Sequence, residues 1–492
     1  MKRGVEILLF LILFAANVYF FPRWADWGQN SRLDLTLAIV DQGSFEIGDY
    51  YHNTGDYAKF EGRYYSDKAP GPSFLGVPVY AAARPLLQSG PVQGIITRLA
   101  SSDAFGSTLN EEGTGLQQEK IYQALVLMIV TMVVVALPSA FLGVLLYRLL
   151  NQINEARGWN VAAVLVWGLA TPAFPYSGTF ISHQLVAFLL FAAFWLGFQM
   201  RQGRLSPAWA GLVGFLLGYA VISEYPSAVI AGGIALYALL TMPDKRWLAA
   251  AVVGGLLPVA GMMAYNYSIF RTVLPVGYEY SELYTEQHSQ GFLSLTYPHF
   301  EALWGITFGS FRGLFFLAPV LLLAVAGFVP WWRTKRLRPE LYVCAWAVIS
   351  YLLYNGSSIM WQGGFAIGPR YVVPMLPFLA AGFGGFAARW GRALWARLLM
   401  GILTAWSVFA VWAETLGGQS FPDWTPNPLF NYSLPQLAQG NIARNMGMVL
   451  NLSGWSSVLL LVVVLAIGIF LIARILRSGP RKEIGAAQKE PA

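Results

Sequence analysis

The feature that most constrains the fold of this chain is the recurrence of long apolar segments along its 492 residues. Several of these segments reach the roughly 20 residues that an α-helix needs to cross the hydrocarbon core of a bilayer. Hydrophobic residues make up 56% of the sequence and charged residues only 12%, which is about half the charged fraction of a soluble domain. The sequence therefore predicts an all-α polytopic membrane protein.

The apolar segments predict about twelve transmembrane helices. They lie at 5–21, 121–147, 160–175, 183–200, 207–223, 225–241, 247–267, 313–331, 340–356, 371–388, 394–413 and 455–475. The first follows Met1-Lys2-Arg3 and so resembles a signal peptide, but no small-residue cleavage site follows it, and we expect it to be retained. Residues 1–476 are expected to form one transmembrane catalytic domain, and the charged residues 477–492 a disordered cytoplasmic tail.

Lysine and arginine gather in alternate loops, which sets the expected topology. The basic loops include 148–157, 201–204, 333–338 and 389–397, and the positive-inside rule places them, with both termini, in the cytoplasm. This predicts a multi-pass protein of the plasma or inner membrane whose polar site faces outward. The net charge of +7 then reflects topology, so no nucleic-acid partner is expected. The single cysteine, Cys344, excludes an intramolecular disulfide.

The outward loops are longer and are rich in aromatic and polar residues. They are expected at 22–120, 265–312 and 414–455. In the first loop, Gly71–Leu87 and Pro91–Ala100 are too short or too interrupted to span a bilayer, which predicts amphipathic helices lying in the interface. Alternation around Glu61-Gly62 predicts a β-hairpin in the same loop.

Two sets of charged residues in this first loop could carry chemistry. Asp34 lies on a short predicted helix, where a partly desolvated carboxylate could act as a general base. An interaction with the dipole at the helix N-terminus, or an ion pair with Arg32, is an equally good interpretation. Asp67-Lys68 precedes Ala69-Pro70-Gly71. Lysine is a compact cation suited to a phosphate, although snorkelling to lipid headgroups is the common alternative.

Other candidates lie at the outward ends of later helices. Arg370 follows a glycine-rich segment that opens at Trp361, and Arg312 begins another helix; both could bind a phosphate, although an arginine that anchors a helix end is the ordinary interpretation. His183 and Glu224 occupy neighbouring outward turns. They could bind a sugar or cap helices, and a divalent cation held by Asp67 or His183 is a further candidate.

These segments resemble the GT-C superfamily of membrane glycosyltransferases, specifically bacterial relatives of protein O-mannosyltransferases and of the aminoarabinose lipid A transferase. An acid soon after the first helix is a hallmark of the family, and Asp34 is similar to it, although Leu35 stands where the family often has a second acid. Asp67-Lys68-Ala69-Pro70 is similar to an acid-Lys-Pro-Pro element with one proline replaced. We expect no counterpart of the soluble C-terminal domain that some relatives carry.

The resemblance implies inverting transfer of a sugar from a polyprenyl-phosphate donor to a hydroxyl of a glycan, lipid or protein acceptor. Asp34 would be the base, and Lys68, with Arg370 or Arg312, would stabilise the departing phosphate. Asp67 would orient Lys68, the acceptor or a cation. The residues expected to bind the sugar or acceptor are Tyr64, Tyr65, His183, Glu224, Tyr278 and Trp361.

A secondary transporter of about twelve helices is the first rival interpretation, but transporters place polar groups near the membrane midplane, whereas charge is scarce in the middle of these helices. A polymer ligase or flippase of envelope lipids is the second rival. Such ligases usually carry their long loop late in the chain, and here it comes early.

Overall fold

The computed structural model describes residues 2–22, 26–100, 117–274, 277–281, 283, 294–335, 337–417 and 425–478. Each of the twelve apolar segments coincides with helix. The longer helices are α1 (Lys2–Tyr19), α6 (Gln117–Thr131), α7 (Leu137–Ile153), α8 (Arg157–Leu169), α10 (Ser182–Arg201), α11 (Ala210–Ser223), α12 (Ala228–Thr241), α13 (Leu248–Phe270), α17 (Leu321–Arg333), α18 (Arg338–Gly356), α21 (Leu394–Leu416) and α24 (Leu459–Arg477). The predicted tail beyond residue 478 lies outside the described residues.

The remaining elements complete the chain. The loop predicted to be the first on the outward side contains α2 (Trp27–Gln42), η1 (Tyr51–Asn53), β1 (Tyr57–Phe60), β2 (Arg63–Ser66), α3 (Gly71–Leu87) and α4 (Gly90–Ala100). Later come η2 (Met132–Ala136), α9 (Ala173–Ser177), η3 (Pro207–Trp209), η4 (Tyr225–Ser227), η5 (Lys245–Trp247), η6 (Gly277–Tyr280), α15 (Phe300–Thr307), α16 (Leu314–Leu317), η7 (Arg370–Met375), α19 (Leu376–Ala380), α20 (Gly382–Trp390), η8 (Leu429–Ser433), α22 (Leu434–Ala438), α23 (Met446–Val449) and η9 (Gly454–Val458).

The protein is a helical membrane protein. Six helices in the part of the chain that the structure describes are long and apolar enough to span a bilayer. The remaining predicted spans are shorter, less apolar or interrupted: 160–175 divides at Pro172 into α8 and α9, and 313–331 divides at Pro319 into α16 and α17. Proline lacks the N–H that would continue the helical ladder. The number of twelve spans stays a prediction.

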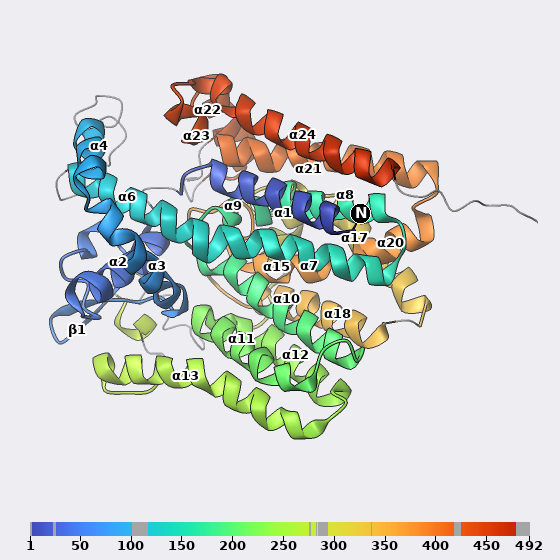
Figure 1. Cartoon of the computed structure of the whole chain (residues 1–492), viewed down its shortest axis with the longest axis horizontal. Helices are drawn as coiled ribbons and strands as arrows, with labels where there is room; N and C mark the ends of the chain where they lie inside the picture. Colours follow the sequence, from blue (N-terminus) through green and yellow to red (C-terminus); the bar gives the residue numbers. More distant parts are fainter. Residues whose placement is uncertain are drawn as a thin grey trace, which may run out of the picture.

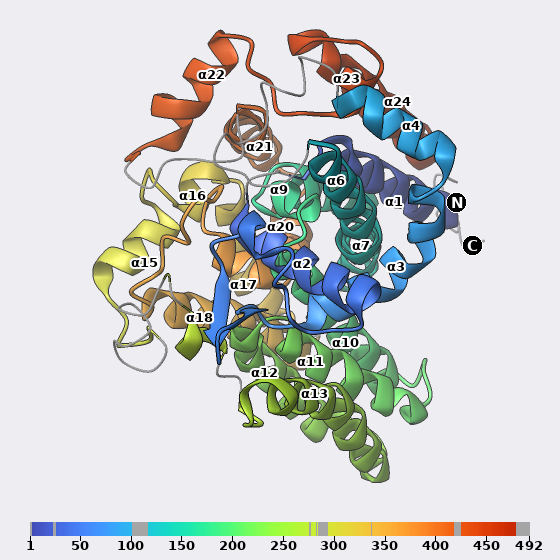
Figure 2. The same cartoon turned by 90° about the vertical axis from the view of Figure 1, so that its left-hand side faces the viewer.

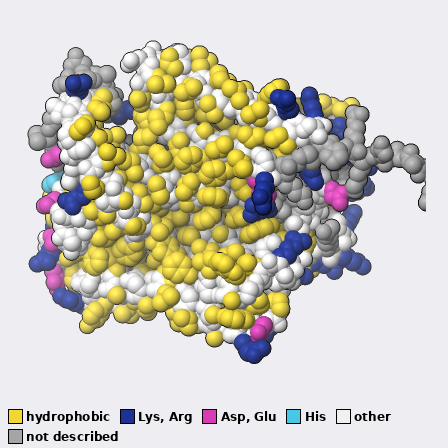
Figure 3. All heavy atoms as spheres, in the orientation of Figure 1, with side chains coloured by type: hydrophobic (Ala, Val, Ile, Leu, Met, Phe, Trp, Pro, Cys, Tyr) yellow, Lys and Arg dark blue, Asp and Glu magenta, His cyan; other side chains and the backbone are white. Residues whose placement is uncertain are grey.

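The long helices run roughly side by side, with the elements of the first outward loop at one end of the bundle (Figure 1). On the face shown in Figure 3, a broad apolar surface separates a charged edge beside that loop from an opposite edge rich in lysine and arginine. An apolar belt between two polar ends is the surface expected of a protein that spans a bilayer.

At the loop end of the bundle, α2 lies across the ends of several long helices (Figure 2). The hairpin predicted around Glu61-Gly62 is present, with Tyr57 opposite Ser66 and Phe60 opposite Arg63. Glu61 (φ 49°) and Gly62 (φ 79°) both adopt left-handed backbone, which the two-residue turns of tight hairpins require. The two segments predicted as interfacial helices are helical, as α3 and α4, and their location in the interface stays a prediction.

Polar contacts fix α2 at both of its ends. At its start, the Asp26 side chain accepts from the Gln29 backbone N–H (3.2 Å), and Gln29 Oε1 accepts from the Phe180 N–H (2.8 Å). At its end, the Asp41 carboxylate accepts from the Tyr80 hydroxyl (3.0 Å) and pairs with Arg84 Nε (2.9 Å) on α3. These contacts hold α2 between the bundle and α3, so the side chains of α2 have defined neighbours.

Candidate functional site

A buried ion cluster forms around Lys68, between strand β2 and helix α3. Lys68 Nζ lies 3.0 Å from Asp56 Oδ2 and 3.2 Å from Asp67 Oδ1. The Asp67 side chain is fully buried, and that of Lys68 is 13% exposed. The structure thus brings together the two residues predicted at this position and adds Asp56, which the sequence had not distinguished from the other acids of the loop.

The ionisation of Lys68 follows from its two carboxylate neighbours. Burial opposes the charge on Lys68, but Asp56 and Asp67 outweigh it and raise the lysine pKa above its usual value. Burial also raises the pKa of Asp67, although Lys68 opposes that shift. Lys68 is therefore a protonated, nearly water-free cation at neutral pH, the form that suits a phosphate ligand.

Neighbouring elements hold this cluster in place. Ser281 Oγ donates to Asp67 Oδ2 (3.1 Å), and the Lys68 backbone N–H donates to Ser66 Oγ (3.3 Å). Lys68 Nζ lies 5.7 Å from the centre of the Tyr278 ring on η6, within the range of a cation–π contact. The structure thus places Tyr278, a predicted sugar-binding residue, beside Lys68.

A second polar group lies where α10 begins and α11 ends. His183 Nδ1 is 2.8 Å from Glu224 Oε2, which also accepts from Ser182 Oγ (3.2 Å). Glu224 Oε1 accepts from the Tyr351 hydroxyl on α18 (3.3 Å). Arg32 on α2 links this group to the first loop, since Arg32 Nη2 donates to Ser182 Oγ (3.5 Å). His183 and Glu224, which were predicted to lie on neighbouring turns, therefore form one buried pair.

The two arginines predicted to bind phosphate differ in their surroundings. Arg370 Nη2 donates to the Tyr371 hydroxyl (3.2 Å), and its buried Nε has no hydrogen-bond partner among the described residues. The Tyr371 ring lies 5.6 Å from that of His183. Arg370 thus contacts a tyrosine that packs against His183, and its Nε donor has no partner among the described residues.

Arg312 instead clamps the loop that precedes Arg370. It is fully buried, and its Nε and Nη2 donate to the carbonyls of Gln362 (3.0 Å) and Gly364 (2.7 Å). We expect Arg312→Lys to lower the free energy of unfolding by about 1.5–3 kcal/mol, because an ammonium cannot make both bonds of the guanidinium fork. Thermal unfolding in detergent checks this, and an unchanged melting temperature would contradict a clamping role.

Asp34 lies on the other side of α2 from Arg32, because two residues are separated by about 200° on a helix. It is 1% exposed, and Oδ2 has no hydrogen-bond partner among the described residues. Burial raises its pKa well above the usual value, while a hydrogen bond from the Asn53 side chain opposes the shift. Among the described residues, Asp34 forms no ion pair with Arg32 or with Lys68. Asp34 is thus an unpaired buried carboxylate, a state typical of functional groups.

The remaining predicted aromatic residues pack against other side chains. The Tyr64 ring stacks on Tyr51 with centroids 3.9 Å apart, and Tyr65 packs against Phe270. Trp361 lies against α15 so closely that Gly305 has no room for a Cβ. Each ring therefore already packs against another part of the fold, and a sugar-binding role for these three residues stays a prediction.

A metal site stays a prediction as well. Asp67 contacts Lys68 and Ser281, and His183 contacts Glu224. Across the described ranges, no group of three or more His, Cys, Asp or Glu side chains is placed to hold a metal ion.

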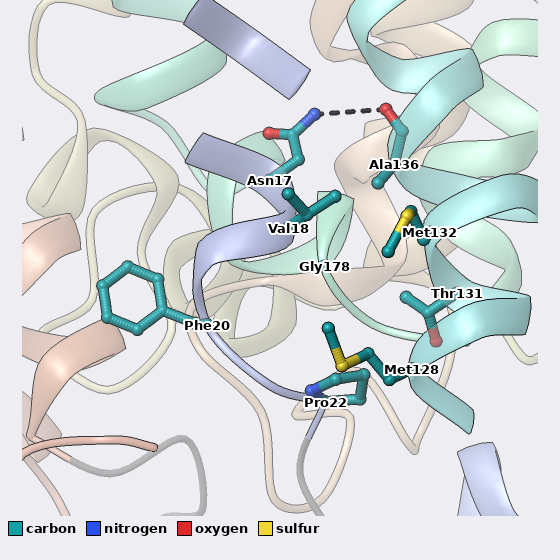
Figure 4. A pocket seen from close by; sticks show the side chains of 9 residues that line it. All are labelled: Asn17, Val18, Phe20, Pro22, Met128, Thr131, Met132, Ala136 and Gly178. Carbon is teal, nitrogen blue, oxygen red and sulfur yellow. Dashed lines mark hydrogen bonds between the residues drawn. The ribbon is translucent and has the colours of Figure 1, made fainter. Parts of the chain in front are cut away.

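A small pocket lies apart from these residues, beside the π-helical turn η2 (Figure 4). Its lining consists of Asn17, Val18, Phe20, Pro22, Met128, Thr131, Met132, Ala136 and Gly178. Asn17 Nδ2 donates to the Ala136 carbonyl (3.4 Å). None of the residues predicted for the site lines this pocket, although Gly178 belongs to the loop that leads to Ser182 and His183.

Sequence reasoning missed Asp56 and Arg32 as members of the site. A local signal existed for each, since Asp56 opens the predicted hairpin and Arg32 lies two residues before Asp34. Which carboxylate pairs with Lys68 depends on how the hairpin folds back beside α2, and residue spacing does not contain that information. Ser281 was missed for the same reason, because it reaches Asp67 from 214 positions away in the chain.

Comparison with protein-family models finds no match, and comparison with curated proteins finds none either. Among solved structures, the chain is similar to ArnT from Cupriavidus metallidurans bound to undecaprenyl phosphate, with a TM-score of 0.48, 15% identity, and coverage of 95% of this chain and 75% of that chain. The apo state of the same protein gives a TM-score of 0.46 at 15% identity, covering 95% and 74%.

Proposed function

We propose that this chain is a membrane glycosyltransferase that transfers a sugar from a polyprenyl-phosphate donor to an acceptor hydroxyl on the extracytoplasmic side. The observation that carries the proposal is the buried Lys68 cluster at the loop end of an apolar helical bundle. A cation held there, beside the apolar helix α3, can meet a lipid-linked phosphate while its prenyl chain stays in the bilayer.

In the proposed reaction, the acceptor hydroxyl attacks the anomeric carbon and the bond from that carbon to the phosphate oxygen breaks. The electrons of that bond leave with the polyprenyl phosphate, whose developing charge Lys68 stabilises. Arg370 would assist through its Nε, which has no hydrogen-bond partner among the described residues. Asp34 takes the proton of the acceptor hydroxyl.

The separation of Asp34 from Lys68 fits an inverting displacement. In such a reaction the incoming oxygen and the leaving phosphate lie on opposite faces of the sugar, so the base and the phosphate ligand need not touch. Asp34 is the carboxylate of α2 that carries no counter-ion in the described chain. Asp67, by contrast, is bound to Lys68 and Ser281, which suits it to orient the lysine.

The His183–Glu224 pair and Tyr278 are proposed to contact the sugar or the acceptor. His183 Nε2 is buried without a hydrogen-bond partner among the described residues, and a buried polar atom gains free energy when a ligand hydroxyl satisfies it. Replacing His183 with phenylalanine should raise KM for donor or acceptor more than it lowers kcat.

The test is to supply purified protein in nanodiscs with sugars linked to polyprenyl phosphates. Undecaprenyl phosphate is the first lipid to use, since the similar ArnT structure is bound to it. We expect release of the lipid phosphate and a product whose anomeric configuration is inverted. Undiminished donor in every combination of sugar and acceptor would reject the proposal, and uptake of solutes by the same protein in vesicles would favour a transporter. Addition of a chelator tests the predicted cation.

A further inference from the structure

Lys68 already has two counter-ions, which limits how it can receive a phosphate. Asp56 Oδ2 and Asp67 Oδ1 lie 3.0 and 3.2 Å from its ammonium group. An ammonium has three donors, and a phosphate placed beside both carboxylates would meet two like charges at close range. A donor phosphate can therefore reach Lys68 in a favourable state only if one carboxylate moves away.

Asp67 is the anchored member of the pair. Its side chain is fully buried, and Oδ2 accepts a hydrogen bond from Ser281. It is also the chain neighbour of Lys68, so it cannot move far from that residue without moving the lysine backbone. Asp67 is consequently the permanent counter-ion.

Asp56 is the exchangeable member. It reaches Lys68 from the segment that precedes β1, its side chain is 10% exposed, and its buried Oδ1 has no hydrogen-bond partner among the described residues. The Asp56 carboxylate interacts with Lys68 through one oxygen only, so moving away from Lys68 breaks few other side-chain interactions.

Arg32 borders the region next to the Asp56 carboxylate. A Cβ placed on Gly28 would lie 3.4 Å from Asp26 Oδ1, 3.5 Å from Arg32 Nη1 and 3.6 Å from Asp56 Oδ2, so the guanidinium lies beside both carboxylates and can offset their charge. Arg32 Nε is buried and lacks a hydrogen-bond partner among the described residues. A phosphate in place of the carboxylate could accept from Lys68 and from Arg32 together.

We propose that Asp56 occupies the place of the donor phosphate in the ligand-free site and leaves Lys68 when that phosphate binds. This inference rests on the proposed function. Asp56 would then act as a positioning residue: it keeps Lys68 charged and oriented between turnovers, and by competing for Lys68 it promotes release of the polyprenyl phosphate product. Because only protein in which Lys68 is free can bind the phosphate, the apparent Kd equals the intrinsic Kd divided by the fraction of protein in that state.

The experiment measures binding of undecaprenyl phosphate, and separately of inorganic phosphate, to the full-length protein in nanodiscs. Asp56→Asn is expected to bind the lipid at least about tenfold more tightly than the wild type, because the amide no longer competes for Lys68. Its kcat should fall together with KM, because product release slows. If inorganic phosphate binding tightens equally, the site recognises the phosphate alone; if only the lipid responds, the prenyl chain contributes as well.

Two controls make the result specific. Asp49→Asn removes an exposed acid of the same loop, whose carboxylate accepts from Gln42 (2.7 Å), and should leave the affinity unchanged. Asp67→Asn removes the anchored counter-ion and should not tighten binding as Asp56→Asn does. Equal or weaker lipid binding by folded Asp56→Asn, with the wild type binding normally, would overturn the inference alone. Failure of the wild type to bind or consume any polyprenyl phosphate would instead overturn the proposed function.

Discussion

Replacing Lys68 with alanine is expected to lower the rate of sugar transfer from a polyprenyl-phosphate donor by about a hundredfold or more. Lys68 is the cation that the fold holds, nearly free of water, between Asp56 and Asp67. Charge develops on the leaving phosphate in the transition state, and in such an environment a fixed cation stabilises it far more than it would in water. The measurement is single-turnover donor cleavage at saturating acceptor.

A control must show whether Lys68→Ala loses activity because the reaction is impaired or because the protein no longer folds. Removing one partner of a buried ion pair costs about 3–5 kcal/mol of stability, so Lys68→Ala is paired with the double variant Lys68→Ala/Asp56→Asn, which removes one orphaned carboxylate. Arg63→Ala removes a 66% exposed cation of the same hairpin and should transfer sugar normally. Full activity in the folded double variant would exclude a phosphate role for Lys68.

Asp34→Asn is expected to lower sugar transfer by at least about a hundredfold while the protein becomes more resistant to heat. Burial holds the Asp34 pKa well above its usual value, which means that the ionised form is disfavoured in the folded protein. Asparagine keeps the shape of the side chain without the charge. A variant that is more stable and less active indicates a residue kept for function, whereas loss of both properties would indicate a structural role.

The same shift fixes the sign of the pH dependence. The folded protein binds the Asp34 proton more tightly than the unfolded chain does, so the stability contributed by this residue is complete below the usual aspartate pKa of 3.8 and is lost as pH rises through the folded value. The rate has the opposite dependence, because the base must be ionised, and it should fall on acidification at a pH above 3.8. An acid limb that is flat, or unchanged in Asp34→Asn, would contradict the assignment.

The fold was largely predictable because membrane helices are long and their apolar character is local. The hairpin was predictable for a similar reason: Glu61-Gly62 is a turn signal inside an alternating segment. The breaks at Pro172 and Pro319 were not predicted, although proline was visible in each segment. A hydropathy pattern averages over such breaks and so merges α8 with α9 and α16 with α17.

The site was predictable in part. Asp67 and Lys68 are neighbours in sequence, so their pairing required no knowledge of the fold. The pairing of His183 with Glu224 and of Lys68 with Asp56 joins residues on different elements, and the packing of α10, α11 and the hairpin decides it. Arg312 shows most clearly what the sequence could not predict. Its sequence surroundings are similar to those of Arg370, but in the fold it donates hydrogen bonds to the carbonyls of Gln362 and Gly364.

The most direct test of the central claim is donor cleavage by purified protein in nanodiscs, compared between wild type, Asp34→Asn and the folded Lys68 double variant. The proposed function predicts that the wild type releases polyprenyl phosphate and transfers the sugar, and that each variant inserts normally but loses about a hundredfold or more in rate. Donor cleavage at the wild-type rate in both variants, or no cleavage by the wild type with any polyprenyl-phosphate sugar, would contradict it.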